Sequence, residues 1–177
     1  GRWLAAGTVV TVDLWDHRRG TLSASLPARG IRAAAFSTDS TSLCWLDEDG
    51  VATLPLAGAG DPGAVPPRRD ASRPWTHLSM ATGTNTLVLA DGTADSLVVR
   101  RTGQPDLPLG PHQFVRFTTL SRDGGRVASG SLTQPGVLVW ESVRGQRLAS
   151  LDSGLNVRPV FSADGHWLAA SGPTCSL

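Results

Sequence analysis

Short apolar runs separated by turn residues extend along the whole chain. The clearest set comprises residues 114–120, 126–132, 137–140 and 147–151, each bounded by Gly, Asp, Ser, Pro or Asn. Runs of this length with such boundaries are typical of β-strands. No stretch of useful length has apolar residues at the i, i+3, i+4, i+7 positions of an amphipathic helix. The pattern therefore predicts an all-β chain with almost no helix.

The strand pattern repeats along the chain. An apolar strand that ends in Ser and a polar turn occurs at residues 35–39, 119–124 and 160–165, with a weaker copy at 79–83. Taking Ser37, Ala81, Ser121 and Ser162 as equivalent positions gives spacings of 44, 40 and 41 residues. A period of about 40–45 residues with four short strands is typical of a β-propeller blade. The sequence predicts about four four-stranded antiparallel blades.

Two further motifs, taken with this repeat, resemble those of a known protein family. Leu14-Trp15-Asp16 and Val139-Trp140-Glu141 each close the third strand of a repeat. Together with the Phe-Ser-x-Asp-Gly turn and the period, they resemble the WD40-repeat β-propeller family over essentially the whole chain. The strand order of that family implies a partial blade at 1–30, blades at 31–74, 75–110 and 111–154, and a partial blade at 155–177.

The interrupted repeats at both ends indicate a segment of a longer propeller, an incomplete ring whose remaining blades belong to the same chain. The alternative is a small closed ring in which residues 156–162 complete the first blade. The longer propeller requires further repeats beside this segment, whereas the small closed ring does not.

The resemblance also implies a structural tetrad of His, Ser or Thr, Asp and Trp within a blade. His112, Ser129 and Trp140 fit this tetrad in the blade at 111–154, but Gln134 occupies the Asp position. Trp15 is the corresponding Trp of the first partial blade. The blade at 31–74 has Asp49-Gly50 in its turn between the second and third strands, and no Trp after it. The tetrad is therefore expected only in part.

Composition narrows the function classes. The chain has 16 basic residues, all Arg, against 15 acidic residues, for a net charge of +1. This balance argues against a nucleic-acid or membrane-surface protein. No apolar window approaches the roughly 18 residues of a transmembrane helix, and no signal peptide opens the chain. Cys44 and Cys175 form no disulfide framework. We expect a cytoplasmic protein, and the abundance of Arg without Lys suggests a GC-rich bacterial gene.

Motifs for catalysis or cofactors are weak. Gly58–Gly63 matches G-x-G-x-x-G, but the prolines that follow forbid the helix that a dinucleotide site needs. Asp47–Gly50 is an acidic hairpin turn rather than a calcium loop, because a strand follows it. No His pair has metal-ligand spacing. A Ser-His-Asp triad assembled by folding stays open, although no G-x-S-x-G motif is present. We expect no cofactor, no metal and no catalytic residue in this segment.

Basic residues recur near the start of the first strand of each repeat. Arg32 and Arg116 lie five residues before the marker position, and Arg158 and His77 lie four before it. In the WD40 family this strand start lies at the mouth of the central channel, so the resemblance implies a partner site there. Arg favours bidentate capture of carboxylate or phosphate. We predict an acidic or phosphorylated protein or peptide partner, with solvated strand-end Arg residues as the alternative.

These observations favour one function and leave two open. The leading hypothesis is a non-catalytic protein–protein interaction scaffold within a larger signalling or regulatory protein. The alternatives are the propeller domain of a hydrolase-type enzyme, and an exported sensor or ligand-binding propeller. The loop at 57–74 is interpreted as a flexible, solvated segment that could hold a degenerate fourth strand around 64–68. The alternative is a second contact surface with Arg68, Arg69 and Arg73.

Overall fold

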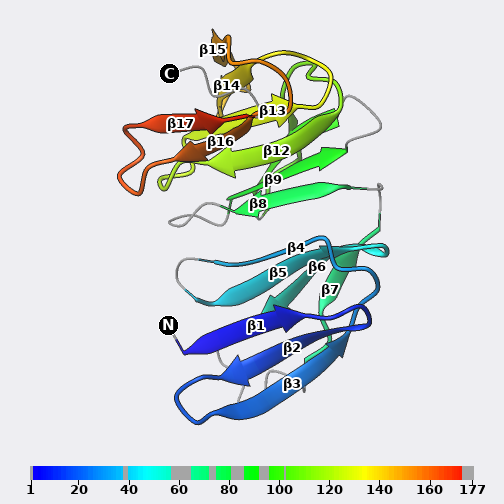
Figure 1. Cartoon of the computed structure of the whole chain (residues 1–177). Helices are drawn as coiled ribbons and strands as arrows, with labels where there is room; N and C mark the ends of the chain where they lie inside the picture. The colour runs from blue at the N-terminus through cyan, green and yellow to red at the C-terminus, as the bar shows by residue number, and fades with distance from the viewer. Residues whose placement is uncertain are drawn as a thin grey trace. The chain divides into compact units, whose positions relative to one another are not determined.

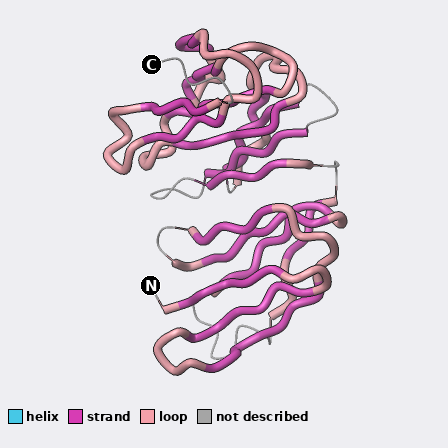
Figure 2. Tube along the Cα trace, viewed as in Figure 1, coloured by secondary structure: helices cyan, strands magenta, loops and turns pink. Residues whose placement is uncertain are grey.

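The computed structural model describes residues 2–37, 40–56, 65–71, 75–80, 86–91, 96–101 and 103–172. The elements in this part of the chain are all β-strands, which confirms the all-β prediction (Figures 1 and 2). None of the described residues forms a helix long and apolar enough to cross a membrane. Several positions discussed above lie outside the described residues, namely Gly58–Gly63, Arg73, Ala81 and Cys175.

The chain divides into two compact units, and the first is Gly1–Pro74. It holds a three-stranded sheet of β1 (Trp3–Gly7), β2 (Thr11–Asp16) and β3 (Thr21–Pro27). Its second sheet has four strands, β4 (Ala33–Phe36), β5 (Ser42–Asp47), β6 (Gly50–Pro55) and β7 (Arg68–Asp70).

The second unit is Trp75–Leu177. One four-stranded sheet comprises β8 (His77–Met80), β9 (Thr86–Asp91), β10 (Ser96–Arg101) and β11 (Leu107–Pro108). The next comprises β12 (Val115–Leu120), β13 (Arg126–Ser131), β14 (Val137–Glu141) and β15 (Arg147–Leu151). A two-stranded sheet of β16 (Arg158–Phe161) and β17 (Leu168–Ser171) follows.

Every sheet is antiparallel, and its strands pair in chain order. Most consecutive strands of a sheet are joined by short turns, which place each strand beside the one before it. The repeated four-stranded antiparallel sheets agree with the predicted fold class. The blade boundaries at residues 30, 74, 110 and 154 remain a prediction from the sequence.

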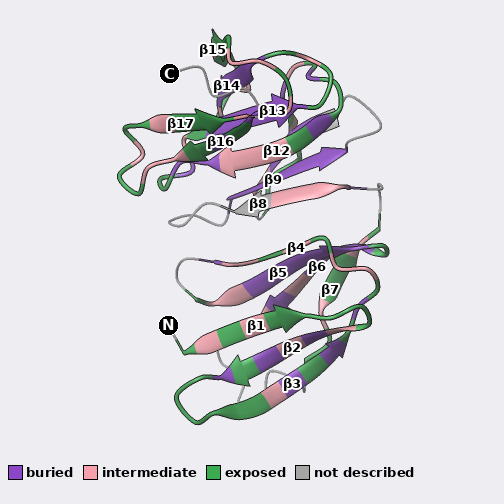
Figure 3. Ribbon diagram, viewed as in Figure 1, coloured by how far each residue is buried: buried purple, intermediate pink, exposed green. Residues whose placement is uncertain are grey.

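Apolar side chains pack between successive sheets within each unit, and the strands that carry them contain the buried stretches of Figure 3. In the first unit Leu14 on β2 packs with Leu43, Trp45 and Leu54 of the next sheet. In the second unit the corresponding core joins the two four-stranded sheets. Its buried members include Val88, Val99, Val127 and Trp140. Burying apolar surface between sheets is the main favourable term for their association.

The sheets of the second unit also approach each other through their backbones. A Cβ atom at Gly130 on β13 would lie 1.9 Å from the carbonyl oxygen of Val157, which precedes β16. Any side chain at residue 130 would therefore clash with the backbone that leads into β16. Glycine at this position allows β13 to support the start of β16, where one of the predicted binding residues lies.

Candidate functional site

The second unit places the first strands of three successive sheets next to one another. β8 lies beside β12, and β12 lies beside β16 (Figure 1). These strands carry His77, Arg116 and Arg158, three of the four residues predicted for partner binding. Arg32 directly precedes β4 in the first unit, where its backbone N–H donates to the Leu46 carbonyl at 2.9 Å. The candidate site is therefore built on β8, β12 and β16.

Two guanidinium groups lie around a single aromatic ring in this site. The Cζ atom of Arg116 is 5.7 Å from the centroid of the Phe117 ring, and that of Arg158 is 5.9 Å from the same centroid. Both distances are within the range of a cation–π interaction. We call these three residues the Arg–Phe–Arg cluster. The sequence predicted both Arg residues but not Phe117, which joins them.

A β-bulge explains how neighbouring residues can share this cluster. Along β12, Val115 pairs with Ser131 and Phe117 pairs with Gly130, so Arg116 is an extra residue without a partner on β13. In a regular strand, residues 116 and 117 would point to opposite faces of the sheet. The bulge breaks this alternation and bends the strand. It thus allows the Arg116 side chain to reach the ring of the residue after it.

The segments that lead into β12 and β16 share an unusual backbone conformation. Phe114 has φ 49° and Asn156 has φ 55°, each two residues before an Arg of the cluster. Both segments are held against the end of β13, since the Phe114 carbonyl accepts from the Leu132 N–H at 3.1 Å and the Asn156 N–H donates to the Ser131 carbonyl at 2.9 Å. A left-handed conformation is uncommon for a bulky residue such as Phe. Phe114 is 45% exposed, so it offers an apolar surface two residues before Arg116 in the chain.

The charges of the cluster are not neutralised by acidic side chains. In the part of the chain that the structure describes, neither Arg116 nor Arg158 lies in an ion pair with a carboxylate. Both residues are exposed. His77 on the neighbouring β8 is half-buried, and its Nδ1 lies 2.9 Å from Thr76 Oγ1. The cluster therefore offers two positive groups to an anion from solvent.

Behind this surface, three predicted tetrad residues form a buried hydrogen-bonded relay. The indole Nε1 of Trp140 donates to Ser129 Oγ at 3.2 Å, and Ser129 Oγ lies 2.7 Å from His112 Nδ1. Ser129 Oγ is thus the shared hydrogen-bond partner of both rings. The relay connects β13 and β14 to the segment that precedes β12.

The fourth member of the tetrad is missing from this relay. His112 is buried, and its Nε2 has no hydrogen-bond partner. Gln134, at the expected Asp position, instead uses Oε1 to accept from the backbone N–H of Gln113 at 3.0 Å. Burial without a nearby carboxylate lowers the pKa of His112 to about 4. The imidazole is thus neutral at pH 7.

Trp15 forms no comparable relay. It lies on β2 of the first unit and is 38% exposed, in contrast to the buried Trp140. Its sheet has three strands among the described residues, whereas the sheet that carries Trp140 has four.

A polar link that the sequence did not predict is present in the sheet β4–β7. Buried Asp47, rather than Asp49, accepts from Trp45 Nε1 at 3.0 Å. Both carboxylate oxygens also accept from the guanidinium of Arg69 at 2.9 Å, and Arg69 donates further to the Pro27 carbonyl at 3.0 Å. Arg69 thus connects β7, β5 and the end of β3. Arg69 therefore has a structural role, while a contact surface on the loop that contains it stays a prediction.

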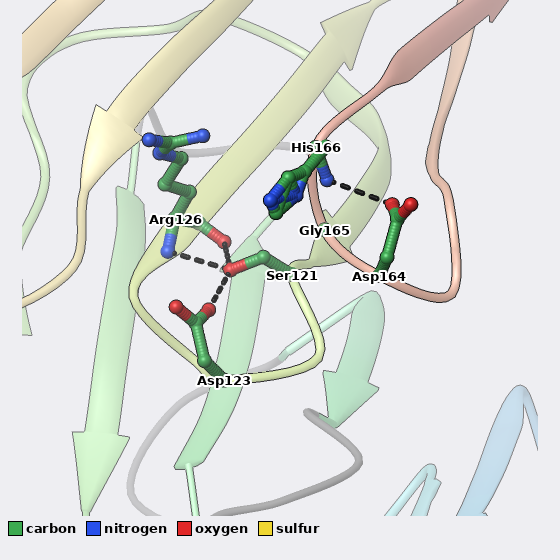
Figure 4. A pocket seen from close by; sticks show the side chains of 6 residues that line it. All are labelled: Ser121, Asp123, Arg126, Asp164, Gly165 and His166. Carbon is green, nitrogen blue, oxygen red and sulfur yellow. Dashed lines mark hydrogen bonds between the residues drawn. The ribbon is translucent and has the colours of Figure 1, made fainter.

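Two equivalent turns enclose a small polar pocket (Figure 4). The β12–β13 turn contributes Ser121, Asp123 and Arg126, and the β16–β17 turn contributes Asp164, Gly165 and His166, around a volume of about 240 Å³. Ser121 Oγ donates to Asp123 Oδ1 at 2.6 Å, and Asp164 Oδ1 accepts from the His166 backbone N–H at 3.0 Å. The hydrogen bond from Ser121 lowers the pKa of Asp123. The hydrogen bond from Ser162 lowers the pKa of Asp164.

This pocket contains Ser, His and Asp side chains without the hydrogen bonds of a hydrolytic triad. The proton of Ser121 is directed to Asp123, and the Ser121 oxygen accepts the Arg126 backbone N–H at 2.9 Å. A triad requires the base to accept the serine proton and the acid to orient the imidazole. Here Asp164 binds a backbone N–H. Among the described residues, no group of three His, Cys, Asp or Glu side chains could hold a metal ion.

Comparison with known proteins settles the fold. No family model and no curated protein matches the chain. Among solved structures, the Cps50 (Swd1) β-propeller domain of Myceliophteria thermophila matches with a TM-score of 0.76 over 96% of this chain, at 15% identity. The chain has a β-propeller fold.

Two other solved structures are similar to this chain. Hydrazine synthase of Kuenenia stuttgartiensis has a TM-score of 0.74 at 15% identity, and Hsv2 of Kluyveromyces lactis has 0.73 at 16% identity, each over 96% of this chain. The chain spans 52% and 55% of the lengths of these two structures and 58% of Cps50. It therefore covers about half of each solved propeller, and identities this low establish the fold alone.

The propeller fold explains the position of the Arg–Phe–Arg cluster. Propeller blades are sheets arranged radially around a central channel. In the second unit the first strands of successive sheets, β8, β12 and β16, are neighbours. The cluster accordingly lies where the first strands of neighbouring sheets meet.

Proposed function

We propose that this propeller is a WD40-type, non-catalytic protein-interaction module of a larger signalling or regulatory protein, and that it binds a negatively charged segment of its partner. The observation that carries this proposal is the Arg–Phe–Arg cluster, in which Arg116 and Arg158 lie around Phe117 without a carboxylate partner in the described residues. His77 on the neighbouring β8 of the same unit would add a contact. The partner segment would be acidic or phosphorylated.

Physical considerations support a protein partner. Binding residues that project from a rigid sheet scaffold lose little conformational freedom when a partner binds. The two guanidinium groups start from neighbouring strands of such a scaffold. Arg is enriched in interfaces because its planar group both stacks on aromatic rings and forms bidentate hydrogen bonds. An acidic peptide that crosses the strand starts could satisfy both groups at once.

A hydrolytic function receives no such support. Its best candidate is the pocket of Ser121, Asp164 and His166, in which the Ser121 proton is donated to Asp123. The match to hydrazine synthase concerns a protein named as an enzyme, at 15% identity. The scaffold proposal therefore rests on residues of this chain, whereas the enzyme alternative rests on fold likeness alone.

Hydrogen exchange tests where a ligand binds. An acidic peptide added to the full chain should slow amide exchange at the starts of β12 and β16, and should leave the outer strand β15 unchanged. Protection restricted to the turns at Ser121 and Asp164 would place binding at the polar pocket and contradict the proposal.

A further inference from the structure

We propose that the Arg–Phe–Arg cluster selects a phosphate monoester on the partner peptide over carboxylate side chains. This inference rests on the proposed function, because it specifies which anion the binding surface recognises. Two positively charged guanidinium groups lie near one aromatic ring. Arg116 and Arg158 both lie within 6 Å of the Phe117 centroid.

The charge of the cluster matches that of one phosphate monoester. Neither guanidinium forms an ion pair with a carboxylate among the described residues, so the two charges reinforce each other. One carboxylate carries a single negative charge and matches one guanidinium. A phosphate monoester carries a charge of about −1.5 to −2 at pH 7 and three acceptor oxygens. A single phosphate group therefore carries enough charge for both Arg residues, whereas two carboxylates would be needed to supply the same charge.

The scaffold prepares the two guanidinium groups for a shared ligand. The bulge at Arg116 brings its side chain to the ring of Phe117, and Arg158 reaches the same ring from β16. Gly130 allows the backbone at Val157 to approach β13, which sets the position of the Arg158 segment. Groups held in place before binding lose less entropy when the ligand binds. Each guanidinium can offer two parallel N–H groups to phosphate oxygens.

The surroundings favour a peptide as the carrier of the phosphate. Phe114, which is 45% exposed, lies two residues before Arg116 and offers an apolar contact to a side chain that flanks the phosphate. Binding to membranes or nucleic acids depends on many positive charges, and the chain has a net charge of only +1. A phosphopeptide can use both the cluster and the exposed aromatic ring.

Fluorescence anisotropy with charge-matched peptides tests this inference. One labelled peptide carries a phosphoserine beside a leucine, and the second carries two aspartates in place of the phosphoserine. The full chain should bind the phosphopeptide at least about tenfold more tightly, which corresponds to one additional charge-assisted hydrogen bond. Arg116→Lys and Arg158→Lys keep the charge but lose the planar group. Each should reduce this preference, whereas Arg147→Lys on the outer strand β15 should retain it.

The outcomes separate the inference from the proposed function. Equal affinity for the two peptides would overturn phosphate selection and leave an anion-binding propeller. Absence of binding to either peptide would overturn both. Binding to vesicles that contain phosphorylated inositol lipids, without binding to the phosphopeptide, would assign the phosphate to a membrane and overturn the peptide proposal.

Discussion

His112 Nδ1 lies 2.7 Å from Ser129 Oγ in the buried relay, while His112 Nε2 has no hydrogen-bond partner. His112 Nδ1 is thus hydrogen-bonded to a residue of β13, whereas Nε2 lacks the partner that an Asp would supply. The residue lies two positions before Phe114 and four before Arg116. The relay consequently holds the segment that leads to the binding surface, and its protonation should affect the stability of the fold.

Acid should destabilise the propeller through His112. Its pKa of about 4 lies below the usual 6.5, so the unfolded chain takes up the proton first as pH falls. The contribution to stability is complete above about pH 6.5 and is lost as pH falls toward 4. Between pH 7.5 and 5 the free energy of unfolding should drop by about 2 kcal/mol from this group. Urea unfolding at the two pH values measures the drop, and the same drop in His112→Gln would contradict this assignment.

Removal of the central hydroxyl of the relay should destabilise the second unit. Ser129→Ala leaves Trp140 Nε1 and His112 Nδ1 without their shared partner. Two buried polar atoms without hydrogen bonds cost about 2–4 kcal/mol together. Ser150→Ala, on the outer strand, is the matched control and should change stability by less than about 0.5 kcal/mol. Equal effects of the two substitutions in chemical denaturation would show that the relay contributes nothing.

The backbone contact at Gly130 should not tolerate a side chain. Gly130→Ala places Cβ 1.9 Å from the Val157 carbonyl oxygen, and the structure must shift to relieve this clash. We expect a loss of at least about 3 kcal/mol in the free energy of unfolding. Gly103→Ala has no atom within 4 Å of its new Cβ, but its φ of 76° is unfavourable for Ala. This control should lose only about 1–2 kcal/mol, and thermal unfolding of both variants compares them.

In the first unit, Asp47 and Asp49 should differ sharply although they are two residues apart. Asp47→Ala removes the buried partner of Arg69 and Trp45, and should cost about 3 kcal/mol. Asp49→Ala changes an exposed carboxylate and should cost less than about 0.5 kcal/mol. Urea denaturation that gives the two variants equal stability would refute the structural role of Asp47.

The strands and their repeat could be predicted because both are local in the sequence. Alternating apolar runs and turn residues determine each strand, and the polar turn after the first strand recurs at spacings of 44, 40 and 41 residues. His112, Ser129 and Trp140 could be singled out because they match a spacing known from the family. Each of these features depends on residues close together in the chain or at a fixed period.

Other features depend on contacts that no periodicity shows. Arg69 reaches Asp47 across 22 positions of the chain. The bulge at Arg116 breaks the strand alternation without any Gly or Pro to mark it, so its contact with Phe117 could not be anticipated. The pocket between the two turns arises only when neighbouring sheets pack together. The sequence therefore located the strands of the proposed binding surface but not the aromatic ring that lies beside both Arg residues.

The most direct measurement is the affinity of the full chain for the labelled phosphoserine peptide after both cluster cations are removed. Arg116→Ala combined with Arg158→Ala should weaken binding at least about 30-fold, because two charge-assisted contacts are lost. Arg147→Ala should leave the affinity within about twofold, since residue 147 lies on the outer strand β15. Unchanged affinity in the double variant, with its fold intact by circular dichroism, would contradict the binding role of the cluster.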